Sequence, residues 1–217
     1  MKEPTTAQAA QQPRDIRKRA FGEGYEPTRV DRLGIWLSAV QIRRAAGSLR
    51  GMRVADIGCG YHADFARTLL ADAESLLLAD IHLAPELRSH PKVQALQGLL
   101  PDSLAFVSDG SVDVVVCNSV LEHLSDPLTA ISAMRRITAP GGLILLNVPS
   151  WRGKRFLELS AFRLGLSPAD EMNDHKMYYD PRDLWPLLVR AGFRPQDVRC
   201  FRHKFGLNTF AVCRKIA

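Results

Sequence analysis

Two acidic residues and two glycines have the types and the spacing to bind a nucleotide. Asp56 lies near the end of a short apolar run, and Gly58 and Gly60 follow it. Asp80 ends the next apolar run. Glycine lets the backbone turn tightly and lets a ligand approach main-chain atoms, and the first N–H groups of a following helix are unpaired. The pattern predicts a ligand-binding corner around residues 54–61, with an acid near the ribose.

The spacing of these residues alone is also compatible with a dinucleotide such as NAD. Gly58, Gly60 and Ala63 also fit the dinucleotide fingerprint, which ends in glycine or alanine. Asp56 opposes that assignment because dehydrogenases usually carry an apolar or small residue two positions before the first glycine. A NAD-binding dehydrogenase is therefore the weaker alternative.

A sheet must hold these residues, and the apolar runs predict one. Short apolar runs alternate with segments of helical spacing from residue 53 onward, and several runs are continuous rather than alternating. Continuous runs are typical of parallel strands covered on both faces. The expected strands are 53–57, 75–80, 93–97, 112–118 and 142–148, and the expected helices lie near 62–71, 83–89, 126–138 and 181–191.

The last two expected strands, 194–201 and 207–214, are separated by too few residues for a crossover helix. They should form an antiparallel hairpin. The sequence thus predicts an α/β, Rossmann-like fold, with a seven-stranded, mostly parallel sheet, an antiparallel C-terminal hairpin and helices on both faces.

The length of 217 residues fits one domain with appendages. Residues 1–20 are polar and end in a basic cluster, which predicts a disordered lead before a domain of residues 21–217. An apolar stripe at helical spacing predicts an amphipathic helix that packs ahead of the first strand. The stripe consists of Val30, Leu33, Leu37 and Val40.

An insertion at about 150–179 contains a basic amphipathic segment, 154–166. At the carboxyl end of the sheet this segment would be a lid over the pocket, and a plain packing helix is an equal alternative.

Composition limits the class of protein. No apolar run approaches the roughly 18 residues of a spanning helix, and the N-terminus lacks the apolar core of a secretory signal. We therefore expect a cytoplasmic protein. The net charge of +6 favours an anionic partner, without the interleaved aromatic residues of single-strand nucleic-acid binders, and peripheral membrane contact stays open. The four cysteines and six histidines show no ligand spacing, so no metal is expected.

From Val54 to Arg214 the chain resembles the class I S-adenosylmethionine-dependent methyltransferases. The segment Asp56-Ile-Gly58-Cys-Gly60 is similar to their first motif, and Leu78-Ala79-Asp80 is similar to the end of their second strand. The run 114–124, followed by Asp126-Pro127 and by the segment 140–149, resembles their fourth and fifth strands.

The resemblance implies S-adenosylmethionine as cofactor and assigns its contacts. Gly58 and Gly60 would approach the methionine moiety, which Asp56 would orient. Asp80 would accept hydrogen bonds from the ribose hydroxyls, and the backbone carbonyl of Asn118 would accept one from the cofactor ammonium. Ile81 and Leu99 would lie against adenine.

Two positions depart from the family pattern. His62 stands where a third glycine is common, so the turn is bulkier. The third strand ends in Gln97-Gly98-Leu99-Leu100 rather than in an acid near adenine. His62 is the one feature that supports an alternative, a catalytically silent partner subunit.

The resemblance also bears on the acceptor. Segments 174–181, 184–193 and 204–211 look like those of small-molecule members, which implies a hydroxyl of a saccharide, a lipid-linked compound or a natural-product intermediate. The basic lid is consistent with an anionic acceptor. A hydroxyl acceptor needs a base, and His123 and His175 are the candidate catalytic residues near the expected pocket mouth.

Overall fold

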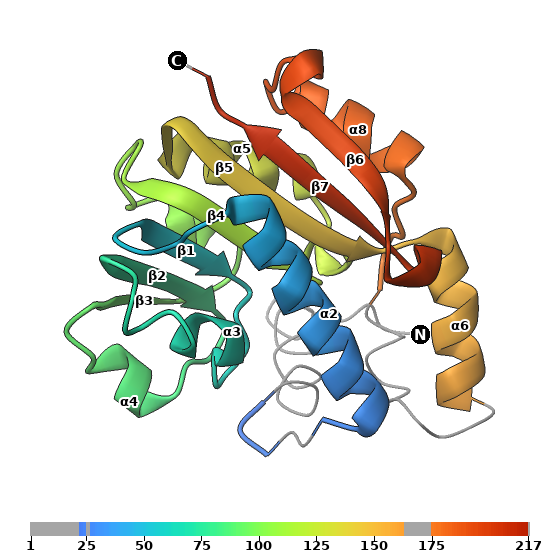
Figure 1. Ribbon diagram of the computed structural model, residues 1–217, viewed down its shortest axis with the longest axis horizontal. Coiled ribbons are helices and arrows are strands. Elements are labelled where there is room, and N and C mark those ends of the chain that lie inside the picture. Colours follow the sequence, from blue (N-terminus) through green and yellow to red (C-terminus); the bar gives the residue numbers. More distant parts are fainter. Residues whose placement is uncertain (1–21, 25–26, 163–174, 217) are drawn as a thin grey trace, which may run out of the picture.

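The computed structural model describes residues 22–24, 27–162 and 175–216. Its strands form one seven-stranded sheet in the order β3-β2-β1-β4-β5-β7-β6 (Figure 1). The first five strands are parallel, and β7 pairs antiparallel with both β5 and β6. The predicted fold class is confirmed. The strands are β1 Arg53–Ile57, β2 Ser75–Asp80, β3 Val93–Gln97, β4 Val112–Asn118, β5 Thr138–Pro149, β6 Val198–His203 and β7 Asn208–Arg214.

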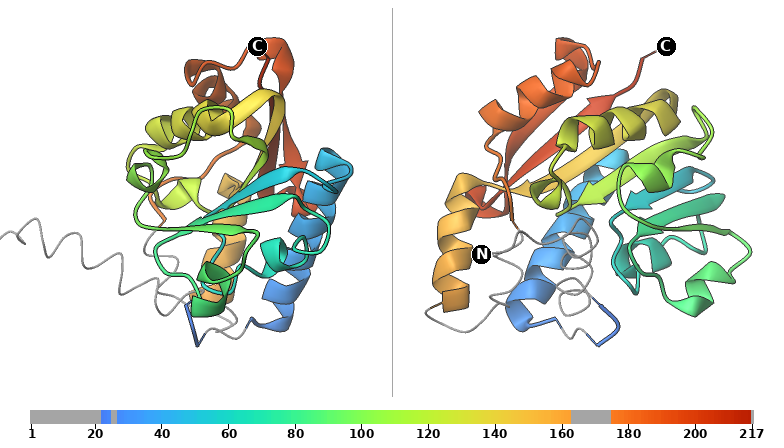
Figure 2. Two further views of the ribbon diagram at one scale, coloured as in Figure 1. Left: turned by 90° about the vertical axis from the view of Figure 1, so that its left-hand side faces the viewer. Right: turned by 180° about the vertical axis from the view of Figure 1, so that it is seen from behind.

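Helices cover both faces of the sheet, as predicted. On one face α5 and α8 pack on a core that includes Ile131, Met134 and Leu184, and Figure 2 shows these helices from behind. On the other face α2, α3 and α4 contribute Ile42, Ala66 and Leu87 to a second core. The helices are α2 Arg29–Ala46, α3 Asp64–Arg67, α4 Pro85–Arg88, α5 Pro127–Ile137, α6 Trp151–Phe162 and α8 Pro181–Arg190, and the 3₁₀ turns are η1 Asp102–Leu104, η2 Leu121–His123, η3 Pro195–Asp197 and η4 Lys204–Gly206.

Several predicted boundaries differ from the structure. The helix expected near 62–71 is the single turn α3: Ala63 before it takes a left-handed conformation with φ of 47°, and after it Thr68 and Leu69 make turn bonds three residues back, to Phe65 and Ala66. Strand β5 starts at Thr138 instead of 142 and continues through the glycines at 141 and 142. Gly142 is needed there, because a Cβ would lie 2.6 Å from the carbonyl oxygen of Asp113. The sixth strand begins at Val198 rather than 194, since η3 occupies 195–197.

The predicted orientation of the first long helix is wrong. The stripe expected to pack on the sheet is largely exposed in α2, with Val30 at 41%, Leu33 at 54% and Val40 at 44%. The buried positions of this helix are Ser38 and Ile42. Ser38 is short enough for α2 to lie close to the sheet, where its hydroxyl accepts a hydrogen bond from Asn147. The apolar stripe therefore faces outward.

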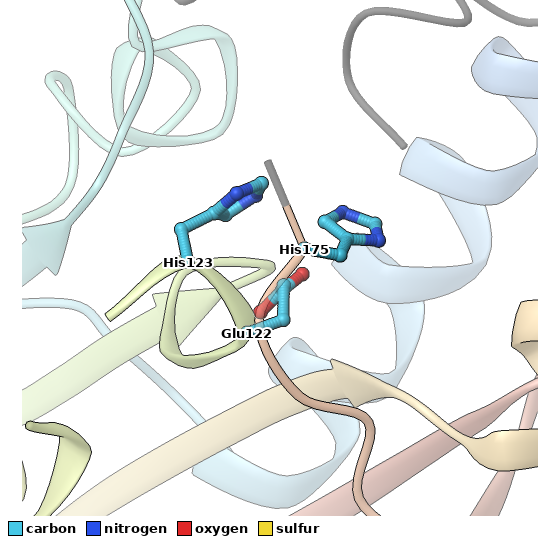
Figure 3. A group of neighbouring side chains, drawn as sticks. All are labelled: Glu122, His123 and His175. Atoms are coloured by element: carbon cyan, nitrogen blue, oxygen red, sulfur yellow. The ribbon is translucent and has the colours of Figure 1, made fainter. Parts of the chain in front are cut away.

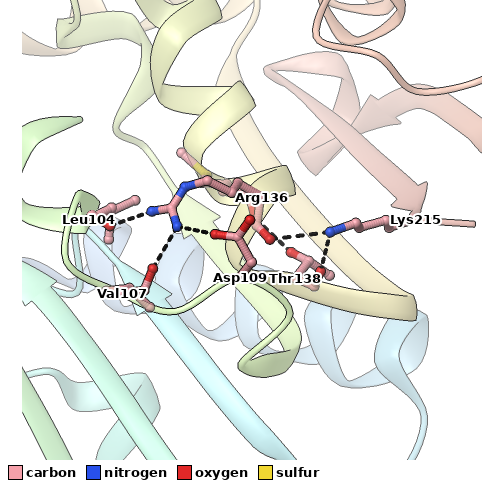
Figure 4. A network of polar contacts seen from close by, with 7 residues as sticks. Leu104, Val107, Asp109, Arg136, Thr138 and Lys215 are labelled. Carbon is pink, nitrogen blue, oxygen red and sulfur yellow. Dashed lines mark hydrogen bonds and ion pairs between the residues drawn. The ribbon is translucent and has the colours of Figure 1, made fainter. Parts of the chain in front are cut away.

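A polar network fixes the end of the sheet opposite the binding corner. Arg136, in the last turn of α5, donates hydrogen bonds to the carbonyls of Leu104 and Val107 and pairs with Asp109 (Figure 4). The ammonium of Lys215 donates to the carbonyls of Arg136 and Thr138. Cations at the last carbonyls of a helix satisfy acceptors that have no partner within the helix. The network thus holds the α5–β5 connection.

The insertion after β5 begins with helix α6. It starts at Trp151, earlier than the expected 154, because Ser150 caps it by accepting a hydrogen bond from the amide of Gly153. Gly153 packs tightly on the β6–β7 turn, since a Cβ there would lie 2.0 Å from the carbonyl oxygen of Leu207. The expected lead, residues 1–20, and the segment 163–174 lie outside the described residues. No helix within the described ranges combines the length and apolar character needed to cross a membrane.

Candidate active site

The glycine corner lies between the ends of β1 and β2. The amide of Gly58 donates to the carbonyl of Ala79 at 2.7 Å. Gly58 has φ of 71°, and a Cβ at this position would lie 2.1 Å from Cγ2 of Val120. Only glycine fits this conformation and this space without rearrangement. Glycine at this position therefore lets Val120 pack directly against the turn, and the close approach of a ligand to the backbone stays a prediction.

Asp80 ties the end of β2 to this turn. Its Oδ2 accepts a hydrogen bond from the amide of Gly60 at 2.8 Å, and its Oδ1 accepts one from the amide of Ile81 at 2.7 Å. Each carboxylate oxygen has a second lone pair, so both can accept a further hydrogen bond. The carboxylate is thus oriented by two backbone donors and can still bind two hydroxyls.

Asp56 is a buried acid without a cation beside it among the described residues. Its side chain is 4% exposed, and burial first, then the nearby charge of Asp80, raises the pKa of Asp56 to about 7. A positively charged ligand group in the corner would favour the ionised form of this carboxyl. The site is therefore suited to a cationic ligand.

The end of β4 carries a polar chain that the sequence predicted only in part. Asn147, on the neighbouring strand β5, donates from Nδ2 to Oδ1 of Asn118 at 2.7 Å and to Oγ of Ser38 at 3.3 Å. Asn147 is buried, and the chain passes β4, β5 and α2. The amide of Ser119, which has φ of 56°, donates to the carbonyl of Asn147. These contacts hold Asn118 next to the glycine corner.

The residues expected near adenine lie at the ends of neighbouring strands. Ile81 follows β2 and is partly buried, whereas Leu99 follows β3 and is 39% exposed. Strands β2 and β3 are paired in parallel, so both residues lie at the same edge of the sheet. Their contacts with adenine stay a prediction.

His62 turns toward the segment ahead of α2. Its Nε2 lies 3.2 Å from the carbonyl oxygen of Glu23, and its ring packs edge-on against Tyr61. The side chain of His62, which stands where a third glycine is common, thus points toward residues 22–24. This contact accounts for how the turn accommodates a histidine.

The structure brings the two candidate bases together. The rings of His123, in η2, and His175 have centroids 4.7 Å apart (Figure 3). Nδ1 of His175 lies 3.0 Å from the hydroxyl of Tyr178. The backbone carbonyl of Glu122 accepts hydrogen bonds from the amides of Lys176 and Met177, which anchors the segment of His175 to η2. Sequence spacing could not show this pairing, because 51 positions separate the two histidines.

Glu122 completes a cluster with the two histidines. Ligand atoms of Glu122, His123 and His175 all lie within 4.8 Å of one another, a spacing at which they can hold a metal ion. The buried ammonium of Lys204 interacts electrostatically with Glu122 and would oppose a cation there. The absence of a metal stays a prediction.

Lys204 is a cation near this cluster whose ammonium is withdrawn from solvent, and the sequence did not reveal it. It lies in the β6–β7 turn at a positive φ of 47°, and its Nζ is 3.7 Å from the position of a Cβ on Gly34. Burial lowers the pKa of Lys204 to about 8, although the charge of Glu122 acts in the opposite direction. Lysine in a hairpin turn is normally exposed, so nothing in the sequence indicated its burial.

The fold and the glycine corner define the class of protein. A family model described as a methyltransferase domain matches residues 32–198, which is most of the chain. The protein belongs to this family and is a class I S-adenosylmethionine-dependent methyltransferase, as the sequence predicted.

The particular relatives are named for oxygen methylation. The chain is 30% identical over 171 residues to a ubiquinone biosynthesis O-methyltransferase of Bordetella avium, across 73% of this chain and 68% of the relative. It is 28% identical over 178 residues to a protein of the same name in Psychrobacter arcticus, across 75% of this chain and 67% of the relative.

Solved structures show the same fold. One is a methyltransferase in complex with the Trm112 methyltransferase activator of Haloferax volcanii, with a TM-score of 0.64, 15% identity and coverage of 84% of this chain and 90% of the other. Another is an S-adenosylmethionine-dependent methyltransferase of Mesorhizobium loti, with a TM-score of 0.58, 14% identity and coverage of 81% and 96%.

The corner fits the cofactor of this family, S-adenosylmethionine. The cofactor carries a sulfonium and an ammonium, and the buried carboxyl of Asp56 would be stabilised in its ionised form by either charge. The ribose has two neighbouring hydroxyls, and both oxygens of Asp80 can still accept a hydrogen bond. The dehydrogenase alternative is set aside.

Proposed function

We propose that the protein transfers a methyl group from S-adenosylmethionine to a hydroxyl oxygen of a small molecule. The observation that carries this proposal is the pair of imidazoles, His123 and His175, beside the end of β4. A hydroxyl must lose its proton as it is methylated, and imidazole is the side chain best suited to accept a proton near neutral pH. The names of the similar Bordetella and Psychrobacter proteins support oxygen as the methylated atom.

The residues divide the work between binding and proton transfer. Asp56, Asp80 and Asn118 would hold the cofactor, which would supply a methyl group bonded to a positively charged sulfur, and that sulfur would be the leaving group. The chain aligns the acceptor oxygen with that methyl group, and alignment alone can supply several kcal/mol, about 7 at effective molarities near 10⁵ M. His123 or His175 would accept the proton of the acceptor hydroxyl as its oxygen takes the methyl group and the cofactor sulfur leaves. Tyr178 orients the ring of His175.

A basic hollow on α6 supports an anionic acceptor. Trp151, Arg152, Lys154 and Arg155 line a space of about 600 Å³ at the start of the insertion. The hollow combines an indole with three cationic side chains. Such a surface favours a phosphate or carboxylate carried on an organic group. Among the expected acceptors, a phosphorylated or lipid-linked hydroxyl compound fits these charges best.

The alternative of a silent partner subunit makes a different prediction. Such a subunit would bind the cofactor without turning it over. Its one supporting feature, His62, is directed at Glu23 rather than into the turn, so the alternative has no independent support from the described contacts.

Methyl transfer with a labelled cofactor tests the proposal. The purified protein would be incubated with S-adenosylmethionine carrying a labelled methyl group and with matched acceptors bearing a phenolic hydroxyl, a sugar hydroxyl, an amine or a thiol, each with and without a phosphate. We expect label in a methyl ether, with phosphorylated acceptors preferred and with the same rate after chelation of metals. Binding of the cofactor without transfer to any hydroxyl compound would favour the silent subunit, and loss of activity on chelation would assign Glu122, His123 and His175 to a metal.

A further inference from the structure

The outward face of α2 is unusually apolar for an exposed helix. Four of its side chains are large and exposed, at 41%, 54%, 59% and 44% of their area. They recur at helical spacing and form one stripe along the helix, here called the α2 outer face. These residues are Val30, Leu33, Trp36 and Val40.

Arginines lie beside this stripe on the exposed side of α2. Arg29, Arg32 and Arg44 are exposed and have no ion pair or side-chain hydrogen bond within the part of the chain that the structure describes. The one acid of α2 is Asp31, whose carboxylate is occupied in the capping box with Thr28. The exposed side of α2 is therefore apolar and positively charged.

A second exposed ring lies on an element next to α2. Phe205 is 83% exposed and has φ of 58°, a strained conformation for a residue with a side chain. It lies at the tip of the β6–β7 turn, and the neighbouring Lys204 reaches Gly34 in the middle of α2. Figures 1 and 2 show α2 along the outer side of the molecule, with this turn close to it. Helix and turn thus present their apolar side chains from adjoining elements.

We propose that the α2 outer face and Phe205 dock the protein on the surface of an anionic lipid bilayer. A helix with tryptophan, leucine and valine on one side and arginine beside them lies in the membrane interface, with its apolar side among the acyl chains and its cations at the headgroups. Tryptophan is enriched at that depth. An acidic protein partner would match the charge, but a stripe of three aliphatic side chains and one indole, bordered by arginines, favours lipid.

Helix α2 connects the proposed docking surface with the active site. The side of α2 opposite the stripe holds Ser38, whose hydroxyl accepts a hydrogen bond from Asn147 beside Asn118. The same helix therefore contacts the membrane on one side and the polar chain at the end of β4 on the other. The inference does not depend on which acceptor is methylated.

Vesicle co-sedimentation of the full-length protein tests the docking surface. We would compare vesicles of phosphatidylcholine alone with vesicles containing phosphatidylglycerol, at low and at moderate salt. The wild type should bind the anionic vesicles and should bind the neutral ones at least about tenfold more weakly. The double variant Leu33→Glu/Trp36→Glu should lose at least about tenfold in partitioning to anionic vesicles, because two anchors are replaced by repelled charges.

Phe106→Glu is the matched control, because Phe106 is 95% exposed but lies in the loop between η1 and β4. It should bind vesicles as the wild type does. Both variants change exposed residues, so their thermal unfolding should match that of the wild type. Failure of the wild type to bind, equal binding of both vesicle types, or full binding by the α2 variant would overturn the proposal. A wild-type dimer that dissociates in the α2 variant, without vesicle binding, would overturn it in favour of self-association.

Discussion

Asp80 Oδ2 accepts a hydrogen bond from the backbone amide of Gly60, with 2.8 Å between the two atoms. The acid at the end of β2 therefore holds the glycine turn after β1 in shape before any ligand arrives. The corner is organised in advance, which reduces the entropy that cofactor binding must overcome.

The glycine at 58 should be irreplaceable. Gly58→Ala combines a positive φ with a Cβ placed 2.1 Å from Cγ2 of Val120, so we expect it to lower the free energy of unfolding by about 3 kcal/mol and to abolish cofactor binding. Gly51→Ala is the matched control, because Gly51 has φ of 68° and nothing within 4 Å of a Cβ. Gly51→Ala should lower the free energy of unfolding, measured in urea, by about 1 kcal/mol. Equal losses in both variants would contradict the steric argument.

Cofactor affinity should depend on pH through Asp56. Burial, with a contribution from Asp80, raises the pKa of Asp56 to about 7 in the free protein. A cationic cofactor favours the ionised carboxyl, so the complex holds fewer protons than the free protein does. The affinity for S-adenosylmethionine should therefore rise between pH 5.5 and 7 and level off above pH 7. Calorimetric titrations would measure the affinity at each pH, and Asp56→Asn should make the affinity independent of pH in this range. A wild-type affinity that does not change between pH 5.5 and 7 would exclude proton release from Asp56 on cofactor binding.

Lys204 should cost stability at neutral pH. Its pKa is lowered by burial to about 8 from the ordinary 10.5, so between pH 8 and 10.5 the unfolded chain binds more protons and stability rises with pH. At pH 7 both states are protonated and the full cost, about 3 kcal/mol, is present. Lys204→Met should increase the free energy of unfolding at pH 7 by about 2 kcal/mol. In this variant the stability should no longer increase between pH 8 and 10.5.

Lys176→Met serves as the control for that variant, because its ammonium lies at the surface on Ser125. It should change stability by less than about 0.5 kcal/mol. Chemical unfolding from pH 7 to 10 would give both values, and a destabilised Lys204→Met would show that the ammonium makes a favourable interaction.

Removing the base should reduce turnover without affecting cofactor binding. We expect His123→Asn or His175→Asn, whichever removes the proton acceptor, to lower kcat by about 10²- to 10⁴-fold. Tyr178→Phe removes only the hydroxyl beside Nδ1 of His175 and should lower kcat by about tenfold if His175 is the base. Single-turnover rates and cofactor titrations would separate the two effects. Wild-type turnover in both histidine variants would exclude proton transfer by this pair.

Much of the fold could be predicted from the sequence because short local runs of apolar residues mark the strands of the sheet. The continuous apolar run at Val114–Cys117 and the short connection before β7 indicate a parallel centre and an antiparallel ending, and both are present. The first four strands have the predicted bounds. The placement of the glycines and acids at 56–60 and 80 at the ends of strands also follows from local sequence, and their contacts with the cofactor stay a prediction.

The errors arose where tertiary packing decides. The stripe from Val30 to Val40 has helical spacing, but spacing does not say which side meets the sheet, and Ser38 and Ile42 are the residues of α2 that are buried against it. Alanine gives no signal for a positive φ, so the start of α3 after Ala63 was not predictable. The pairing of His123 with His175 depends on a long-range contact.

Binding of S-adenosylhomocysteine to wild-type protein and to Asp80→Asn is the most direct test that the corner between β1 and β2 holds the cofactor. Asparagine keeps the shape of Asp80 but loses the charge and one acceptor, so the affinity should fall by about 10- to 100-fold. Asp72→Asn, which changes an exposed acid paired with Arg50, should bind as the wild type does. Unchanged affinity in Asp80→Asn, with folding intact by circular dichroism, would contradict the placement of the cofactor at this corner.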